Sequence, residues 1–437
     1  MERDTIEKLK QWKDDTNKQP LIIQGARQVG KTWLMQEFGK RHYQKTAYFN
    51  FDSDKNLKEI FNEDFNIKRI VRALEIIAGF KFSLENTLII FDEIQECPRA
   101  LTSLKYFCEN EIKYHIVAGG SLLGLIHLEN SGFPVGKVSF LNLYPLNFFE
   151  FLKATNNTDL INLIKEKDFN LIKIFKNKYE SLLKNYFFIG GMPEVVNDFI
   201  EHEDYNRVRE IQNNILSSYE KDFSKHIPSN IVEKVRMLWR AIPSVLSKKN
   251  KKFIYSAIKE GARAKEYELA LHWLKDAGLI YQIHSVKTPI LPLIAYQNLN
   301  AFKLFIVDIG LLSAITNLDT RVILEKTTIF DEFKGALTEQ FVCQELKSTF
   351  SGEMPIYYWT NETSRAEIDF ILQVSNIIVP VEVKATTNLK AKSLNNFIDK
   401  FKPEKSIRTS LADYKINENN LFDIPLYAVS EFSNLIK

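Results

Sequence analysis

The chain of 437 residues lacks the features that mark secreted and membrane proteins. It has only three cysteines, Cys97, Cys108 and Cys343, whose wide spacing fits neither a disulfide framework nor a metal site. No apolar stretch approaches the roughly 20 residues that a membrane span requires. The first residues, Met-Glu-Arg-Asp, are polar and unlike a secretory signal. We therefore expect a soluble cytoplasmic protein with free thiols and no membrane contact.

An excess of charge of one sign is also missing. Lys and Arg number 58 and Asp and Glu number 55, so the net charge of +3 indicates no class of partner. Internal repeats and low-complexity linkers are absent, and the apolar fraction of 45% is ordinary for globular proteins. The length exceeds that of one ordinary core and predicts two or three domains.

The first part of the chain alternates short apolar runs with amphipathic stretches. We expect strands at residues 21–23, 46–51, 87–91 and 115–118, separated by helices. Such alternation is typical of a parallel sheet with helices on both faces. The sequence therefore predicts a three-layer α/β domain over residues 1–150.

The pattern then changes twice. Residues 151–325 predict long helices, then a helix pair followed by two short strands, which is the outline of a winged helix. Residues 326–437 predict a helix followed by strands at 356–359, 367–372 and 377–383. We therefore expect a helical lid and winged-helix region in the middle and a further α/β domain at the end.

A phosphate-binding pattern, Gly-x4-Gly-Lys-Thr, lies between the first expected strand and helix. Its glycines let backbone N–H groups point at a phosphate, and the helix adds its positive end. Lys31 is expected to bridge the β- and γ-phosphates as a catalytic residue, and the Thr32 hydroxyl to bind Mg²⁺. We predict nucleotide contacts from Gly25, Ala26, Arg27, Gln28, Val29, Gly30, Lys31, Thr32 and Trp33.

A pair of carboxylates, Asp92 and Glu93, follows the apolar run Leu88-Ile-Ile-Phe91. A buried strand would deliver both beside the phosphates, where Asp92 would hold Mg²⁺ and Glu93 would polarise the attacking water. Ser121 ends the next expected strand and is a candidate sensor of the γ-phosphate. The sequence therefore predicts a Mg²⁺-dependent ATPase.

ATP is favoured over GTP because the chain has no Asn-Lys-x-Asp guanine motif; Asn177-Lys178-Tyr-Glu180 comes closest but lies in a helical pattern. No arginine finger is identifiable. Arg27 lies in the loop itself, and Arg99 and Lys137 are candidates for which solvated surface charge is the simpler explanation.

Acidic residues also interrupt two apolar strands near the end of the chain. Asp369 lies in one, and Glu382 and Lys384 share a face of the next. Because buried charges are costly unless paired or metal-bound, Asp369 and Glu382 are candidate Mg²⁺ ligands and Lys384 a catalytic cation. Glu339 in the preceding helix is a further catalytic candidate. Solvated charges at a sheet edge are an equally good explanation from spacing alone.

Two resemblances rest on these motifs. The phosphate loop, Phe91-Asp-Glu-Ile-Gln95 and Ala118-Gly-Gly-Ser121 resemble AAA-like bacterial and archaeal ATPases allied to the signal-transduction (STAND) P-loop ATPases. Phe133-Pro-Val-Gly-Lys137, residues 143–151 and Gly190-Gly-Met-Pro193 also resemble that family. The resemblance implies a P-loop fold that binds ATP.

The second resemblance concerns the end of the chain. Glu339, Asp369, Glu382 and Lys384 resemble the PD-(D/E)xK nuclease pattern, although the Pro of the motif's name is missing before Asp369. The resemblance implies a restriction-endonuclease-like α/β fold over residues 326–437 and a metal-dependent DNA nuclease.

Basic residues gather in the expected winged helix. Residues 221–265 hold twelve Lys and Arg against three Asp and Glu, a local excess of nine positive charges. Such a face is suited to a DNA backbone, although intramolecular contacts with acidic helices explain it as well.

Together these patterns predict an ATPase switch coupled to a nuclease, with ATP and Mg²⁺ as cofactors. DNA is the expected partner, through residues 221–265 and the C-terminal domain. The alternative is an ATP-regulated DNA- or protein-binding regulator with a non-catalytic C-terminal domain. A homo-oligomer is compatible with either, and the sequence does not decide between them.

Overall fold

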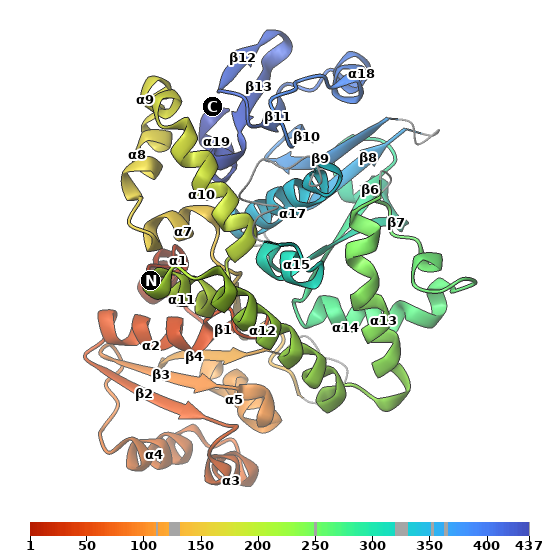
Figure 1. The fold of residues 1–437 in the computed structure, drawn as a ribbon. Helices are drawn as coiled ribbons and strands as arrows, with labels where there is room; N and C mark the ends of the chain where they lie inside the picture. Colours follow the sequence, from red (N-terminus) through yellow and green to blue (C-terminus); the bar gives the residue numbers. More distant parts are fainter. Residues whose placement is uncertain are drawn as a thin grey trace. The chain divides into compact units, whose positions relative to one another are not determined.

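The computed structural model describes residues 1–110, 112–121, 132–248, 251–319, 331–350, 354–361 and 366–436. The chain divides into two compact units (Figure 1). The N-terminal unit comprises Arg3–Tyr144 and Asp276–Gly278, and the C-terminal unit comprises Met1–Glu2, Pro145–Lys275 and Leu279–Lys437. The three cysteines are free thiols, as expected. Among the described residues, no helix has the length and apolarity that crossing a bilayer demands.

The N-terminal unit is built on a five-stranded parallel sheet in the order β2-β3-β4-β1-β5. The strands are β1 (Leu21–Gln24), β2 (Lys45–Asn50), β3 (Thr87–Asp92), β4 (His115–Gly120) and β5 (Ser139–Asn142). The first four confirm the expected strands, whereas β5 was not expected. Parallel strands end at one edge of a sheet, so the segments after β1, β3 and β4 lie close together there.

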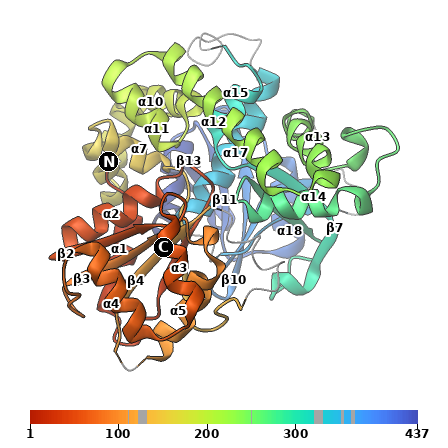
Figure 2. The same ribbon diagram turned by 90° about the horizontal axis from the view of Figure 1, so that it is seen from below.

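Helices cover both faces of this sheet. They are α1 (Thr5–Asp14), α2 (Lys31–His42), α3 (Lys55–Glu63), α4 (Ile67–Ala78) and α5 (Pro98–Glu109). Helices α3, α4 and α5 bury an apolar cluster that contains Phe61, Leu74 and Phe91, and they lie toward the viewer in Figure 2. The central strands β3 and β4 are buried along their whole length, so both faces of the sheet need a cover of helices. The predicted three-layer arrangement is therefore confirmed.

The C-terminal unit begins with helices. They are α7 (Phe148–Ala154), α8 (Thr158–Glu166), α9 (Phe169–Ile174), α10 (Lys176–Ile189), α11 (Pro193–His202), α12 (Tyr205–His226), α13 (Ser229–Leu246) and α14 (Ala264–Asp276). The Gly190–Gly191 segment connects α10 to α11. There the Gly191 N–H donates a hydrogen bond of 2.6 Å to the Asp308 carboxylate. A Cβ atom on Gly190 would lie 2.3 Å from Asp308 Oδ1. The Gly-Gly-Met-Pro motif therefore serves close packing within this unit.

An eight-stranded mixed sheet forms the rest of the unit, in the order β12-β13-β11-β10-β9-β8-β6-β7. Its strands are β6 (Ile280–Val286), β7 (Gln297–Ile306), β8 (Ile356–Thr360), β9 (Glu367–Val374), β10 (Ile377–Val383), β11 (Ser406–Ser410), β12 (Lys415–Asn417) and β13 (Leu421–Pro425). Further helices are α15 (Ile309–Ile315), α17 (Asp331–Thr349), α18 (Lys392–Phe401) and α19 (Phe432–Leu435).

The β6–β7 hairpin differs from the expectation of a separate wing. Strand β6 pairs in parallel with β8, with His284 opposite Tyr357 and Val286 opposite Trp359. Because this ladder joins residues on both sides of position 325, the expected boundary there does not separate two sheets. The strands predicted at 356–359, 367–372 and 377–383 are confirmed as β8, β9 and β10.

Candidate functional site

The phosphate loop joins β1 to α2 in a conformation that requires glycine at both ends. Gly25 has φ of +153°, and a Cβ atom there would lie 2.2 Å from the Leu143 carbonyl oxygen. Gly30 has φ of 94° and immediately precedes the first residue of α2. The loop therefore leads directly into a helix N-terminus, where backbone N–H groups without helical partners attract anions.

Lys31 lies folded against the loop with 6% of its surface exposed. Its ammonium donates to the carbonyl oxygens of Gly25, at 3.0 Å, and Ala26, at 2.8 Å. Burial lowers its pKa to about 8, although nearby Glu93 and Asp92 act in the opposite direction. A phosphate in the loop would supply the negative charge that these neutral carbonyl partners lack.

Thr32 and Asp92 meet across the site. The Thr32 hydroxyl donates to Asp92 Oδ2 at 2.8 Å, although 60 residues separate them in sequence. Asp92 is 2% exposed at the end of β3. A hydroxyl and a carboxylate oxygen in contact are placed as neighbouring ligands of one Mg²⁺, so these residues fit the ion that the P-loop implies.

Glu93 follows Asp92 in a left-handed conformation with φ of 48°. Its carboxylate accepts a hydrogen bond from the Gln95 side chain. Ser121 is 9% exposed directly after β4, the strand between β1 and β3. The strand order thus brings both predicted residues to the sheet edge that carries the loop.

Two residues of this site were missed in the sequence. The buried Arg3 guanidinium donates to the Val29 carbonyl at 3.0 Å and to the Tyr144 carbonyl at 2.6 Å, which holds the loop backbone. The Tyr48 hydroxyl donates to Asp92 Oδ2 at 2.8 Å. Only the position of Tyr48 in a strand next to β3 could have signalled its role, and Arg3 has no local signal.

The remaining loop residues and finger candidates lie as follows. Ala26 and Val29 are buried, whereas Arg27, Gln28 and Trp33 are exposed. Arg99 donates to the Phe61 carbonyl at 2.7 Å, and Lys137 lies 3.2 Å from Glu109. Arg99 and Lys137 thus each have a partner within the unit, rather than being simple solvated charges.

In the C-terminal unit, the four predicted nuclease-type residues converge. The Lys384 ammonium lies 2.7 Å from Glu382 Oε1, and the Val383 N–H donates to Asp369 Oδ2 at 2.8 Å. Glu339, on α17, and Asp369 both face the Lys303 ammonium, at 3.6 Å and 4.0 Å. Glu339 and Glu382 are buried, at 8% and 5% exposure, so a solvated sheet edge does not describe them.

Three residues of this cluster were not predicted. Lys251 forms an ion pair with Glu339. Lys303 of β7 is completely buried, forms an ion pair with Glu367, and lies 3.6 Å from Glu339 Oε2 and 4.0 Å from Asp369 Oδ1. The contribution of a hairpin more than 60 residues before Asp369 has no signal in local spacing.

The electrostatics of this cluster reflect its crowding. Burial would lower the pKa of Lys303, but Glu339, Glu367 and Asp369 raise it well above its usual range. Burial, followed by repulsion from Glu339 and Glu382, raises the pKa of Asp369. The Lys251 and Lys303 ammoniums outweigh burial at Glu339 and lower its pKa.

Asp369 and Glu382 were predicted to bind Mg²⁺ together in the C-terminal unit. Within the described parts of the chain, no group of three or more His, Cys, Asp or Glu side chains is arranged to hold a metal ion. Glu339 Oε2 and Glu382 Oε2 are nevertheless buried without a hydrogen-bond partner in those parts. Lys303 lies 4.0 Å from Asp369 Oδ1 and Lys384 lies 2.7 Å from Glu382 Oε1, so each of the two predicted Mg²⁺ ligands already faces an ammonium group.

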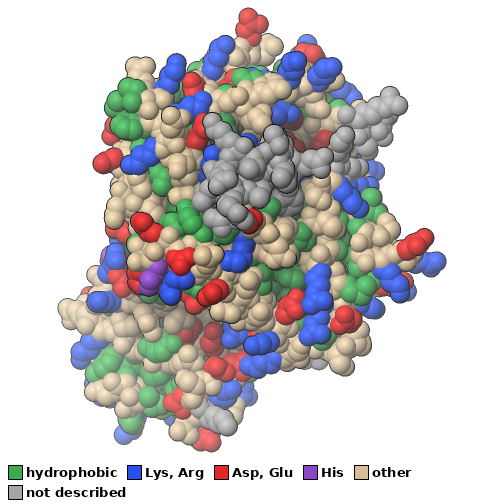
Figure 3. Space-filling view, in the orientation of Figure 1, with side chains coloured by type: hydrophobic (Ala, Val, Ile, Leu, Met, Phe, Trp, Pro, Cys, Tyr) green, Lys and Arg blue, Asp and Glu red, His purple; other side chains and the backbone are tan. Residues whose placement is uncertain are grey.

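The basic stretch of residues 221–265 is partly used within the unit. Arg240 forms an ion pair with Glu220 at 3.0 Å, and Lys251 pairs with Glu339. Lys248, Lys259, Arg263 and Lys265 are exposed, and Lys249 lies outside the described residues. On the face shown in Figure 3, basic side chains are interspersed with acidic ones.

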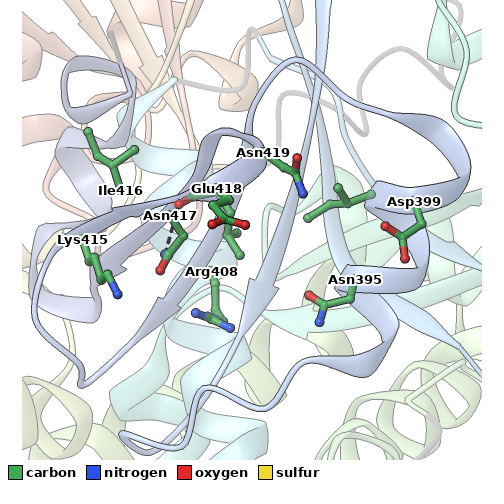
Figure 4. A pocket seen from close by; sticks show the side chains of 10 residues that line it. Asn395, Asp399, Arg408, Lys415, Ile416, Asn417, Glu418 and Asn419 are labelled. Carbon is green, nitrogen blue, oxygen red and sulfur yellow. Dashed lines mark hydrogen bonds between the residues drawn. The ribbon is translucent and has the colours of Figure 1, made fainter.

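A polar recess of about 620 Å³ lies between α18 and the β12–β13 segment (Figure 4). Arg408 lines it, but its guanidinium donates to Asp423 at 2.7 Å and 3.0 Å and also to the Leu389 carbonyl. These internal partners satisfy the strongest charge of the recess, so its chemistry indicates no ligand.

Comparison with known proteins divides the chain in three. Residues 17–152 match a family described as an AAA domain. Residues 180–322 and 334–427 each match a domain of unknown function, DUF8612 and DUF4143. No curated protein matches the chain.

Similar solved structures include three archaeal proteins. A Walker-type ATPase of Pyrococcus abyssi is 13% identical, with a TM-score of 0.46, over 72% of this chain and 95% of that one. The ORC2 protein of Aeropyrum pernix in its ADP form is 12% identical, with a TM-score of 0.30, over 71% and 90%. The ORC1 protein of Aeropyrum pernix in complex with DNA is 10% identical, with a TM-score of 0.27, over 72% and 90%.

The family match covers the strand, loop, helix and carboxylates that meet at the N-terminal sheet edge. The N-terminal unit therefore has the five-stranded parallel sheet and phosphate loop of a P-loop ATPase fold, and residues 17–152 are similar to the AAA domain family.

Proposed function

We propose that the N-terminal unit binds Mg·ATP and hydrolyses it, as a switch for the rest of the chain. The observation that carries this proposal is the 2.8 Å contact between Thr32 and Asp92 beside the ammonium of Lys31. It joins the end of β3 to the start of α2, so a proposed metal ligand from each element lies next to the phosphate loop.

The roles of the side chains follow from their places. The loop amides and Lys31 hold the β- and γ-phosphates, and Thr32 and Asp92 hold Mg²⁺, which neutralises phosphate charge when bound. Glu93 orients a water molecule and accepts its proton, and Ser121 contacts the γ-phosphate. Arg3 keeps the loop backbone in place through the Val29 carbonyl.

Replacement of the proposed base tests this function. In Glu93→Gln we expect nucleotide binding to persist, because the phosphate ligands are intact, and turnover to fall about 10²- to 10⁴-fold. Phosphate release and binding of a fluorescent ATP analogue measure the two properties separately. Unchanged turnover in Glu93→Gln would remove that residue from the mechanism.

For the C-terminal unit, we propose the role of a non-catalytic domain that responds to the nucleotide. Convergence of Glu339, Asp369, Glu382 and Lys384 by itself favours the nuclease predicted from the sequence. The lysines that surround these carboxylates weigh against it. Cleavage of plasmid DNA with Mg²⁺ or Mn²⁺, lost in Lys384→Ala, would favour the nuclease instead.

DNA is the partner we propose for the exposed basic residues between α13 and the first turn of α14. Lys259, Arg263 and Lys265 are exposed close together in sequence, as a phosphate-contacting face requires. Fluorescence anisotropy of a labelled duplex would show weaker binding by Arg263→Ala/Lys265→Ala and a smaller salt dependence. Equal binding by the variant would exclude this face.

A further inference from the structure

The acidic cluster of the C-terminal unit draws on residues that match two different families. Lys251 and Lys303 lie in the part that matches DUF8612, and the carboxylates lie in the part that matches DUF4143. Its members are Lys251, Lys303, Glu339, Glu367, Asp369, Glu382 and Lys384. Four carboxylates thus share the site with three ammonium groups, and the cluster supplies most of its own countercharge.

Lys303 occupies the centre of this arrangement. Its ammonium pairs with Glu367 and faces Glu339 Oε2 at 3.6 Å and Asp369 Oδ1 at 4.0 Å. These oxygens belong to two of the residues expected to assist or bind a metal. A divalent ion bound to both oxygens at about 2.1 Å would lie within about 6 Å of the ammonium, which would repel it.

The surroundings of Lys303 keep it in place. Its side chain is completely inaccessible, and its ammonium also lies 5.0 Å from the centre of the Tyr358 ring. Because β7 pairs with β6 and β6 pairs with β8, the backbone of Lys303 is part of the sheet that carries Asp369. A buried ammonium cannot leave its carboxylates without losing all of its countercharge.

The other two lysines complete the pairing. Lys251 pairs with Glu339 from the segment between α13 and α14. Lys384 pairs with Glu382 at 2.7 Å, so the residue expected to act as a catalytic cation already has a carboxylate partner. Each of the three carboxylates of the nuclease pattern therefore faces at least one ammonium.

We propose that Lys303 takes the place of a metal ion, so that the nuclease-type residues form a metal-independent ion-pair cluster joining the β6–β7 hairpin to β9 and α17. The hairpin thereby becomes a fixed part of the C-terminal sheet. The cluster holds the domain together and does not cleave nucleic acid with a bound metal.

Metal binding by the nucleotide-free full chain tests this proposal, with Thr32→Ala in every protein to remove the metal ligand of the P-loop. Free Mn²⁺ is measured by electron paramagnetic resonance. We expect no bound Mn²⁺ at the cluster of the parent protein. Lys303→Met should bind one Mn²⁺ at the cluster with an affinity at least about tenfold higher than that of the parent protein, because the repelling charge is gone. Adding Asp369→Asn should abolish that binding.

Lys287→Met is the matched control, because it removes an exposed lysine from the segment that joins β6 to β7, the strand of Lys303. It should behave like its parent. One Mn²⁺ bound by the parent and lost in Asp369→Asn would overturn the proposal, whatever the result for P-loop activity.

Thermal unfolding of the parent with Mn²⁺ or with EDTA decides the question if Lys303→Met does not fold. Equal unfolding temperatures in the two conditions support the proposal. Stabilisation by Mn²⁺ that disappears in Asp369→Asn contradicts it. Both measurements are made without ATP, so their outcomes are independent of whether the N-terminal unit hydrolyses nucleotide.

Discussion

Lys31 in the P-loop and Lys303 in the C-terminal sheet are both buried lysines near carboxylates, yet their partners differ. Lys31 donates to two neutral carbonyl oxygens, and burial lowers its pKa to about 8. Lys303 faces three carboxylates, which raise its pKa despite complete burial. A lysine with neutral partners is available to an anionic ligand, whereas one that is already neutralised by carboxylates serves structure.

The largest effect should come from Lys31→Ala. Because no other loop side chain provides a buried cation at the phosphates, we expect turnover to disappear and ATP binding to become too weak to measure. The folded structure should persist, since the carbonyl partners of Lys31 can bind water. Nucleotide titration by fluorescence measures ATP binding, and circular dichroism measures whether the protein is folded. Retained ATP binding would contradict the role of Lys31.

Lys303→Met should instead destabilise the fold. Removal of one partner from a buried ionic cluster leaves uncompensated carboxylates and costs about 3–5 kcal/mol. Denaturant unfolding of the full chain measures the change. Lys384→Met is the matched control, since 29% of that side chain is exposed and its ion pair with Glu382 should contribute less. Equal losses of unfolding free energy in the two variants would show that Lys303 contributes no more to stability than Lys384 does.

Asp308 sharpens the comparison, because hydrogen bonds rather than ammonium groups surround this buried carboxylate. Donors include the N–H groups of Gly191 and Leu311 and the Gln344 side chain, and Tyr186 is a titratable group close by. Burial outweighs these hydrogen bonds and raises the pKa of Asp308 to about 6.

The sign of the pH dependence follows from that shift. A folded pKa above the unfolded value stabilises the fold below about pH 4, and this contribution is lost as the pH rises through 6. As the pH rises between those limits, the free energy of unfolding of the wild type should fall by up to about 3 kcal/mol relative to that of Asp308→Asn. Denaturant unfolding of both proteins at pH 4 and 7 measures it. A pH-independent difference would contradict the ionisation of Asp308.

Tyr48→Phe should have the smallest effect. It removes one hydrogen bond to Asp92 and costs about 1 kcal/mol, or roughly a fivefold rise in the Mg²⁺ concentration needed for half-maximal ATPase activity. Steady-state kinetics at varied Mg²⁺ measures this change. No shift, or one as large as that of Thr32→Ala, would argue against an auxiliary role.

The P-loop site was largely predictable from the sequence because its parts are local. The loop from Gly25 to Thr32 is continuous, and Asp92 and Glu93 follow one apolar strand. The C-terminal cluster depends instead on pairing between β6 and β8, whose residues are more than 70 positions apart. Lys303, on the strand that pairs with β6, was missed for that reason, whereas Lys251 was predicted only as part of the basic stretch of residues 221–265.

The most direct test of the nucleotide site is the Mg²⁺ dependence of ATP affinity in the wild type, Thr32→Ala and Asp92→Asn. We expect Mg²⁺ to tighten ATP binding by the wild type and to have little effect on either variant, because Thr32 and Asp92 bind the same ion. Equal Mg²⁺ dependence in all three proteins would contradict a metal held between α2 and β3.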